Sequence, residues 1–314
     1  MKASDLICIQ GPTASGKSEL AELVAQVLSG QIISADSMQV YRGMDIGTAK
    51  VPPEKRHVRY HCIDLVDPGE PYSAALFQRD ARCAIDSLVA AGTPAILCGG
   101  TGFYVKAVLD EMDFAPGKQR ENAVREKYQA YLDEHGPEAL HALLQQADPQ
   151  SASAIHPHNA KRVIRALEMH EAGESYAERK AAFKHVAPHY PSVRFALSVE
   201  RAVLYRRIDR RVDGMFAAGL VDEVRGLLAH GFRAGLTAPQ AIGYKEVVSA
   251  LDGTCSLDEA SAQIKQATRR YAKRQLSWLR SDKGLIWLDA THASAEELCA
   301  QVLAHVLELS AEKA

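Results

Sequence analysis

The chain lacks the residues that mark several common classes of protein. Its 314 residues include only 6 cysteines, which are scattered without a CxxC pair, and this argues against a disulfide framework and a zinc site. No apolar run reaches the length that crosses a membrane. The net charge of −2 argues against a protein that coats nucleic acid through a global basic excess. The N-terminus enters a strand candidate and not a signal peptide, so we expect a cytoplasmic protein without a membrane partner.

Two motifs of nucleotide hydrolases are missing as well. In phosphate-loop ATPases a second apolar strand usually ends in an aspartate that holds Mg²⁺, but here the strand candidate at 95–98 runs directly into Gly99. The NKxD motif with which GTPases read guanine is also absent. These absences argue against a motor or a switch. They favour a transferase that holds a phosphate group as a handle or a leaving group.

The chain does contain a phosphate loop, GPTASGKS, at residues 11–18. It matches the pattern GxxxxGK[ST] and lies between a strand candidate at 6–9 and a helical run at 19–28, which makes a chance match rare. Backbone amides, Lys17 and the start of the helix would face the anion, and the Ser18 hydroxyl would face Mg²⁺. The pattern therefore predicts a diphosphate or triphosphate ligand. Its binding residues would be Gly11, Pro12, Thr13, Ala14, Ser15, Gly16, Lys17 and Ser18.

Strand and helix candidates alternate on both sides of a helical stretch. This alternation is typical of a parallel sheet covered by helices. Strands are expected at 6–9, 31–34, 62–65, 95–98, 194–199 and 285–288. Helices are expected at 19–28 and 73–91, and in the stretch without strand signals at 121–134, 138–146 and 160–172. We therefore expect an α/β catalytic core formed by residues 1–115 and 192–314, with 116–191 as an all-helical insertion domain.

Two turns of the expected sheet carry polar side chains. Asp36 follows the second strand, and in a doubly wound sheet it is expected to face the phosphate loop, as a metal partner or as the acceptor of a substrate proton. A helix N-cap at Asp36 or Ser37 is the alternative. The run CGGTGFY at 98–104 has three glycines that would let a substrate approach the backbone, with the Thr101 hydroxyl as donor. A plain strand-to-helix turn is the alternative there.

A basic run occupies residues 263–283. It carries 7 lysines and arginines against a single acid, Asp282. An anionic partner would explain this poor compensation, whereas a solvated helix face is the usual explanation of an isolated charge run. Tyr271 and Trp278 lie within the run, where they would stack on bases or form its buried face.

Seven segments in a fixed order resemble the tRNA dimethylallyltransferase family. They are GPTASGKS, SADSMQVYRGMDIGTAK, GGTGFY, KRVIRALE, LYRRIDRRVDGMFAAGLVDEV, AIGYKE and TRRYAKRQLSWLR. The resemblance covers nearly the whole chain and implies a P-loop NTPase-like fold whose loop grips dimethylallyl diphosphate with Mg²⁺. It also implies that the prenyl group goes to N6 of the adenine directly 3′ of the anticodon, in tRNAs that read codons beginning with U.

The resemblance further implies roles for residues at matching positions. Asp36 matches the general base at the adenine N6, Thr101 a position beside the reacting centre, and Arg211 an arginine that holds the diphosphate. Together with Lys17 these are the expected catalytic residues, and Ser18 is the expected metal ligand. The resemblance and the basic run together predict tRNA contacts at Asp36, Ser37, Met38, Gln39, Thr101, Asn159, Ala160, Lys161, Arg162, Val163, Arg269, Arg270, Lys273 and Arg274.

Elementary chemistry agrees with this assignment. The catalyst must neutralise the charge that grows on the departing diphosphate, which cations and loop amides do, and a carboxylate suffices to accept the proton of the alkylated amine. Two alternatives stay open. One is a small-molecule or nucleoside kinase, against which the missing strand-end aspartate counts, and the other is an NTP-gated RNA-binding protein, against which the lack of a switch motif counts. We expect a monomer.

Overall fold

The computed structural model describes residues 5–114, 122–183 and 186–311, and the chain divides into two compact units. The larger unit comprises Met1–Asp110 and Pro188–Ala314, and the smaller one Glu111–Ala187. The sequence places these divisions at 115/116 and 191/192. Residues 115 and 116 lie outside the described residues, and the second division falls a few residues earlier than expected.

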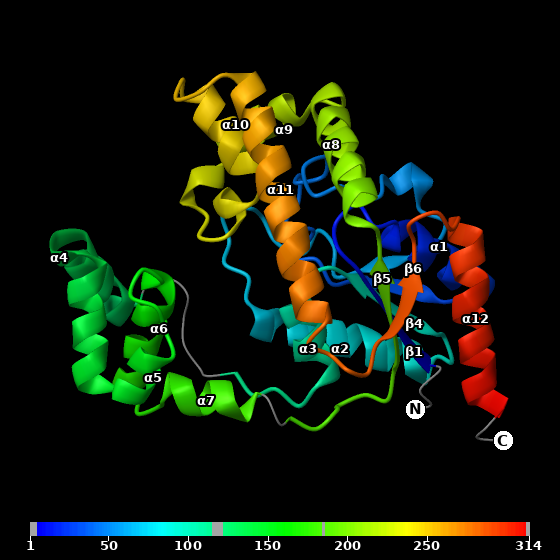
Figure 1. The fold of residues 1–314 in the computed structure, drawn as a ribbon, viewed down its shortest axis with the longest axis horizontal. Helices are drawn as coiled ribbons and strands as arrows, with labels where there is room; N and C mark the ends of the chain where they lie inside the picture. Colours follow the sequence, from blue (N-terminus) through cyan, green and yellow to red (C-terminus); the bar gives the residue numbers. More distant parts are fainter. Residues whose placement is uncertain (1–4, 115–121, 184–185, 312–314) are drawn as a thin grey trace. The chain divides into compact units, whose positions relative to one another are not determined.

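A parallel sheet of 6 strands, in the order β3-β2-β4-β1-β5-β6, forms the centre of the larger unit (Figure 1). The strands are β1 (Leu6–Gln10), β2 (Gln31–Ser34), β3 (Tyr60–His61), β4 (Ala95–Gly99), β5 (Val193–Ser198) and β6 (Ile286–Asp289). Strands β1 and β4 are buried at every position, as expected for central strands of a parallel sheet with both faces covered. The predicted α/β fold is confirmed.

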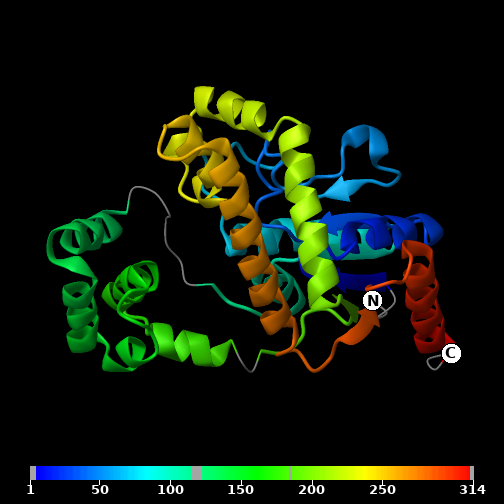
Figure 2. The same ribbon diagram turned by 45° about the horizontal axis from the view of Figure 1, so that its top comes forward.

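Helices cover both faces of the sheet (Figures 1 and 2). Successive side chains of a strand point to opposite faces. Ile7 and Ile9 of β1 accordingly share one core cluster with α1 (Lys17–Val27) and α12 (Ala295–Ala311), whereas Leu6 and Cys8 share another with α2 (Ala74–Ala90). These two clusters fix the central strands, and thereby the positions of the loops at their carboxyl ends.

Further helices of the larger unit stand at the carboxyl ends of the strands, where α8 and α11 pack side by side (Figure 2). These helices are α8 (Arg201–Ala217), α9 (Leu220–Ala229), α10 (Tyr244–Leu251) and α11 (Leu257–Leu279). Helix α3 (Gly102–Leu109) instead packs beside α2 (Figure 1). Short 3₁₀ turns occur at Pro53–Lys55, Phe232–Ala234 and Ala238–Gln240.

The described part of the smaller unit is helical and has its own core. Its helices are α4 (Ala123–Ala147), α5 (Pro149–Ser153), α6 (Ala160–Glu171) and α7 (Tyr176–Ala182). The predicted break at Gly136 and Pro137 is present as a kink within α4, because Gly136 has φ 82° and ψ 173°. The expected start of this helix at residue 121 lies outside the described residues.

The strand expected at 62–65 is an error of the sequence interpretation. The third strand is Tyr60–His61, and the chain turns away from the sheet immediately afterwards. Cys62 and Asp64 have positive φ values of 58° and 56°, which no strand residue adopts. The apolar pattern of this segment instead reflects packing below the loop, since Cys62 belongs to a core cluster.

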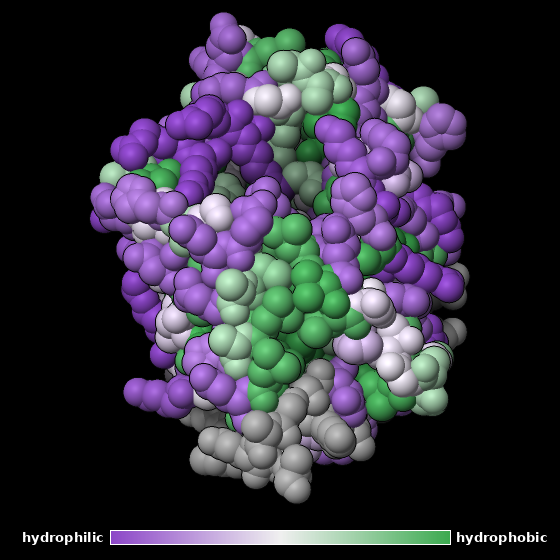
Figure 3. Space-filling view, turned by 90° about the vertical axis from the view of Figure 1, so that its right-hand side faces the viewer, coloured by the Kyte–Doolittle hydropathy of each residue, from purple (hydrophilic) through white to green (hydrophobic). Residues whose placement is uncertain are grey.

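No helix within the described ranges combines the length and the apolar character needed to cross a membrane. The face that carries α1 and α12 does show an apolar patch (Figure 3). Val27 of α1 and Leu307 of α12 have the most exposed large apolar side chains among the described residues, at 61% and 69%. Neither residue lines the cavity described next.

Candidate active site

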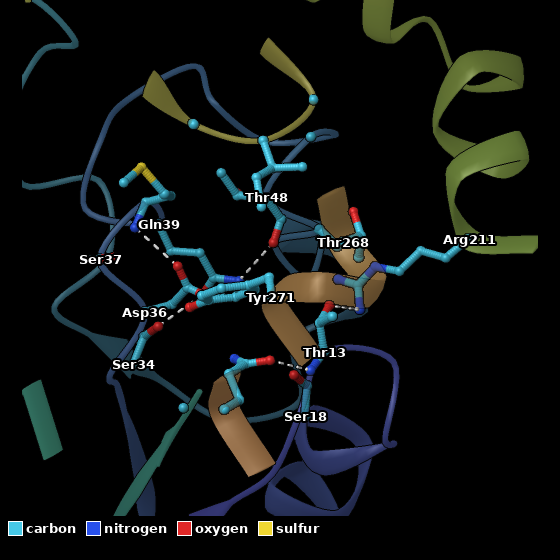
Figure 4. Close-up of a pocket in the computed structure, with 18 of the residues that line it drawn as sticks. Thr13, Ser18, Ser34, Asp36, Ser37, Gln39, Thr48, Arg211, Thr268 and Tyr271 are labelled. Atoms are coloured by element: carbon cyan, nitrogen blue, oxygen red, sulfur yellow. Dashed lines mark hydrogen bonds between the residues drawn. The ribbon is translucent and has the colours of Figure 1, made fainter. Parts of the chain in front are cut away.

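A cavity of about 300 Å³ opens at the carboxyl ends of β1, β2 and β4 (Figure 4). It lies entirely within the larger unit. Three groups of residues form most of its walls: the phosphate loop with the start of α1, the segments that follow β2, and the facing sides of α8 and α11. Residues of β2, β3 and β4 and the segment 240–243 complete the lining. Those central to its chemistry are Thr13, Lys17, Ser18, Asp36, Ser37, Met38, Gln39, Tyr60, Arg211, Tyr271, Arg274 and Gln275.

The phosphate loop has the shape that its sequence predicts. Helix α1 begins at Lys17, after Gly16 in the left-handed conformation, and Ala14 also has a positive φ, 62°. Such alternation turns successive amides toward one point, where they form an anion-binding nest. The Ser15 hydroxyl is buried, and no partner for it lies among the described residues. The loop therefore offers several donors to an anion.

Two half-buried cations face this loop. Lys17 Nζ lies 3.4 Å from the carbonyl oxygen of Pro12, and Arg211 of α8 reaches the Thr13 hydroxyl at 3.5 Å. Desolvation lowers the pKa of both side chains, and the nearby charge of Asp36 opposes the shift in each case. Arg211 additionally lowers the pKa of Lys17 because the two positive charges repel. A bound anion would relieve both penalties.

Asp36 lies across the cavity from Arg211, at the start of the segment that follows β2 (Figure 4). Its Oδ1 accepts a hydrogen bond from the Met38 amide at 2.9 Å, which forms a short turn and not a helix N-cap. In the part of the chain that the structure describes, no donor is bonded to Oδ2. One carboxylate oxygen is thus fixed, and the other remains for a substrate.

Thr101 connects the turn after β4 to the segment after β2. Its Oγ1 accepts from the Ser37 amide at 3.1 Å and lies 3.4 Å from the Ser37 hydroxyl. Gln39 is oriented similarly, because the Ser34 hydroxyl donates to its Oε1 at 2.8 Å and its Nε2 donates to the Thr48 carbonyl at 3.2 Å. The polar side chains that the sequence singled out after β2 and β4 therefore form one network.

Glycines at the end of β4 and in the turn after it allow other segments of the chain to pack closely against this backbone. Strand β4 lies between β1 and β2, so the chain that leaves β2 must cross the end of β4 to reach the phosphate loop. A Cβ atom on Gly99 would lie 2.2 Å from the Ala35 carbonyl oxygen, and one on Gly102 would lie 2.2 Å from the Trp278 indole. These glycines admit this crossing and helix α11. Gly99 also lines the cavity, so the interpretation that this turn lets a substrate approach the backbone stays a prediction.

Helix α11 contributes a residue that the sequence interpretation missed. The Gln275 Oε1 accepts from the Thr13 amide of the phosphate loop, and its Nε2 donates to the Gly100 carbonyl, both at 2.9 Å. Gln275 is buried although its helix is basic. The one signal of this in the sequence is its spacing of three residues from Ala272 and four from Leu279, which puts it on the same buried helix face. One turn earlier, Tyr271 lines the cavity.

The basic run is better compensated than its sequence indicates. Arg269 forms a two-point ion pair with Asp209 of α8, and Lys265 pairs with Asp213 at 2.5 Å. Arg270 and Lys273 are exposed, and neither has an acidic partner within the described residues. Arg274 lines the cavity and lies over the Tyr271 ring. The ion pair with Asp209 gives Arg269 a role in packing α8 against α11. Contact of Arg269, Arg270, Lys273 and Arg274 with an anionic partner stays a prediction.

The predicted tRNA contacts of the smaller unit lie at the start of α6. Asn159 is its N-cap residue, and Lys161 and Arg162 are exposed. Ala160 is half-buried, and the Val163 side chain is fully buried in the core of the unit. The side chain of Val163 therefore serves packing, and a nucleic acid would meet its neighbours.

Comparison with known proteins places this geometry in a family. The family model described as IPP transferase matches residues 39–282. The tRNA dimethylallyltransferase of Streptomyces coelicolor is 46% identical over 298 residues, which cover 94% of either chain. That of Geobacillus kaustophilus is 46% identical over 294 residues, or 93% of this chain and 92% of the relative.

Solved structures agree. The tRNA isopentenylpyrophosphate transferase of Bacillus halodurans matches with 40% identity and a TM-score of 0.70, covering 99% of each chain. A eukaryotic dimethylallyltransferase, solved in snapshots acting on tRNA, matches with 29% identity and a TM-score of 0.77, covering 95% of this chain and 77% of its own. By sequence and by structure, the chain belongs to the IPP transferase family.

Proposed function

We propose that the protein transfers the dimethylallyl group from dimethylallyl diphosphate to N6 of the adenine directly 3′ of the anticodon, in tRNAs that read codons beginning with U. The observation that carries this proposal is the composition of the cavity. A phosphate loop with two desolvated cations faces a carboxylate, Asp36, that has one unbonded oxygen. One wall suits a diphosphate leaving group and the other suits an amine that loses a proton.

On the donor wall, the loop amides with Lys17 and Arg211 would hold the diphosphate. As the bond between C1 and the diphosphate oxygen breaks, negative charge collects on that oxygen, and these groups stabilise it more strongly than they stabilise the intact substrate. The bond from N6 to C1 forms on the opposite side. The Asp36 carboxylate then takes the proton of the alkylated nitrogen, which leaves the product amine neutral. The diphosphate departs with the electron pair of the broken C1–O bond.

The donor wall also fits Mg²⁺. Ser18 brings a hydroxyl into the cavity, and within the described ranges there is no cluster of three or more acidic, histidine or cysteine side chains that would hold a metal by themselves. Mg²⁺ is commonly bound by one or two protein oxygens, with phosphate and water completing its octahedron. Ser18 would thus hold a metal shared with the diphosphate, and the metal would supply additional neutralisation of the leaving group.

On the acceptor wall, Ser37, Met38, Gln39 and Thr101 would contact the adenine or its neighbours. An adenine stacked in an anticodon loop must be extruded before it can reach Asp36, which costs a few kcal/mol. Exposed cations of α11 and of the start of α6 would offset this cost through contacts with phosphates. We further propose that a monomer acts on its tRNA, in the cytoplasm.

A direct assay tests this function. The protein is incubated with dimethylallyl diphosphate, Mg²⁺ and an unmodified tRNA transcript whose anticodon reads a codon beginning with U. We expect release of pyrophosphate and a mass gain of one prenyl group on the RNA. The matched control is the same transcript with guanine in place of the target adenine, which should stay unmodified. Turnover of ATP without tRNA, and no prenyl transfer, would instead support the kinase alternative.

The depressed pKa of Lys17 predicts how diphosphate binding responds to pH. The folded-state pKa of this base is lowered, mainly by desolvation, so its charge is lost at a lower pH than that of an ordinary lysine. Pyrophosphate affinity should therefore weaken as the pH rises through that shifted pKa. In Lys17→Arg the cation does not titrate, and the affinity should stay flat over the same alkaline range. Calorimetric titrations at several pH values measure this, and parallel pH profiles would contradict it.

Lys273 tests whether α11 meets the RNA backbone. Its ammonium is exposed and has no acidic partner among the described residues, so Lys273→Ala should weaken binding of all substrate tRNAs alike. The slope of the logarithm of the tRNA binding constant against the logarithm of the salt concentration should decrease in magnitude by about 1. Arg225→Ala is the matched control, since Arg225 is an exposed arginine that is paired with Asp222 at 2.8 Å. An unchanged salt slope in Lys273→Ala would instead indicate that this face of α11 contacts only solvent.

A further inference from the structure

An irregular loop, residues 44–50, forms part of the acceptor wall. Gly47, Thr48 and Ala49 line the cavity, yet the loop contains no helix or strand that would fix it. Two internal backbone hydrogen bonds shape it, from the Ala49 amide to the Ile46 carbonyl and from the Lys50 amide to the Asp45 carbonyl, both at 3.0 Å. The Thr48 hydroxyl also donates to the Met44 carbonyl at 2.5 Å. Internal bonds alone leave three successive amides, those of residues 45–47, without partners from the loop.

Glu223 of α9 supplies these partners. Its Oε2 accepts from the amides of Ile46 at 2.7 Å and Asp45 at 3.0 Å, and its Oε1 accepts from the amide of Gly47 at 3.2 Å. Tyr244 of α10 donates its hydroxyl to the same Oε1 at 2.6 Å. Consecutive amides that converge in this way usually form a nest for a bound anion, and here the anion is a side chain of the protein. Hydrogen bonds to an ionised acceptor are also stronger than neutral ones.

The loop passes this constraint to a residue of the acceptor wall. The Thr48 carbonyl accepts from Gln39 Nε2 at 3.2 Å, while the Ser34 hydroxyl fills Gln39 Oε1. The Thr48 carbonyl therefore orients the Gln39 side-chain amide, with Nε2 toward Thr48 and Oε1 toward Ser34. Gly47 is pressed against Tyr244 in the same arrangement, because a Cβ atom there would lie 2.4 Å from the Tyr244 ring. Glu223 itself does not line the cavity.

We infer that Glu223 is a positioning residue for the acceptor substrate: its carboxylate acts as a built-in anion that fixes the 44–50 loop and, through the Thr48 carbonyl, the amide of Gln39. The inference rests on the proposed function. It assigns Glu223 to recognition of the tRNA and not of the diphosphate, since the phosphate loop and Arg211 do not contact the 44–50 loop through any hydrogen bond among the described residues.

The loop has a second anchor that lets variants of Glu223 fold. Lys50 is buried, with a side-chain exposure of 2%, and its ammonium bonds to the Tyr41 carbonyl at 2.6 Å, to Asp45 at 2.7 Å and to Asp64 at 2.5 Å. This buried cation ties the two ends of the loop, residues 45 and 50, to each other without Glu223. Loss of the carboxylate should therefore loosen residues 45–47 and leave the surrounding fold in place.

Steady-state kinetics with both substrates test the inference. In Glu223→Ala, the KM for an anticodon stem-loop should rise about tenfold, because three amides lose their acceptor and Gln39 loses its orientation. The KM for dimethylallyl diphosphate should stay within about twofold. Glu223→Gln should fall between the two, since a carboxamide keeps one acceptor oxygen and turns its NH₂ toward the amides. Anisotropy of a labelled stem-loop, measured without prenyl donor, should show the same order of affinities.

Chemical rescue separates a positioning role from a merely structural one. Acetate should restore part of the stem-loop affinity of Glu223→Ala, because the nest would accept an external carboxylate, and it should leave Glu223→Gln and the wild type unchanged. Asp222→Ala is the matched control, as an adjacent exposed carboxylate of α9 whose ion-pair partner among the described residues is Arg225. An unchanged KM for the stem-loop, an equal rise in both KM values, or no rescue by acetate would each overturn the inference. A wild-type protein without prenyl transfer would refute the proposed function instead.

Discussion

The substitution Asp36→Asn should lower kcat by about 10²- to 10⁴-fold, the usual contribution of a positioned general base. The amide keeps the shape of the side chain and the acceptor oxygen for the Met38 amide, so the turn after β2 should persist. What it loses is the ability to take a proton. Single-turnover transfer of a labelled prenyl group to a tRNA transcript measures the chemical step without product release.

The diphosphate provides an internal control for this variant. Asp36 carries the same sign of charge as the ligand and lies near Lys17 and Arg211, so its neutralisation should leave pyrophosphate affinity intact or slightly strengthened. Asp67→Asn is a matched surface control, because Asp67 is 67% exposed and pairs with Arg42 outside the cavity. A change confined to KM, with kcat preserved, would exclude Asp36 as the base.

Arg211→Ala should reduce kcat/KM for dimethylallyl diphosphate by about 10²- to 10³-fold, as the loss of one preorganised donor to a developing oxyanion commonly does. Arg211 is half-buried and directed at the Thr13 hydroxyl, and desolvation already penalises its charge in the absence of an anion. The charge becomes favourable once the diphosphate is bound. Steady-state rates over a range of donor concentrations, at saturating tRNA, give the ratio.

Helix α8 offers a close control for Arg211. Arg210 precedes it in the sequence but is exposed and does not line the cavity, so Arg210→Ala should leave donor kinetics within about twofold of the wild type. Arg211→Lys should recover only part of the loss, because lysine keeps a charge but lacks the planar fork that meets two phosphate oxygens. Equal kinetics in Arg211→Ala and Arg210→Ala would remove Arg211 from the donor wall.

The sequence predicted those parts of the fold and the site that depend on local patterns. The phosphate loop, the α/β alternation and Asp36 each follow from residue types at fixed spacing. The structure brings the loop, Asp36 and Arg211 to one cavity, and Thr101, which does not line it, bonds to Ser37 beside Asp36. The strand at 62–65 failed because a buried loop and a strand share the same apolar signal over four residues. Only backbone conformation at Cys62 and Asp64 separates the two.

Contacts between distant segments were beyond the sequence. Gln275 lies 262 residues from Thr13, and Glu223 lies 178 residues from Asp45. Neither pairing leaves a periodicity or a composition signal, because each depends on how helices above the sheet pack. The compensation of the basic run by Asp209 and Asp213 belongs to the same class, since the acids come from another helix. Charge counts along one helix miss partners that tertiary packing supplies.

The crossing of the chain over the end of β4 restricts which residue can occupy position 99. The Ala35 carbonyl oxygen stands 2.2 Å from where any side chain at Gly99 would begin. An aspartate at this strand end, as found in phosphate-loop hydrolases, would displace the very backbone that carries Asp36 into the cavity. Gaining that carboxylate by a single substitution would therefore shift Asp36, the proposed base, from its present place in the cavity.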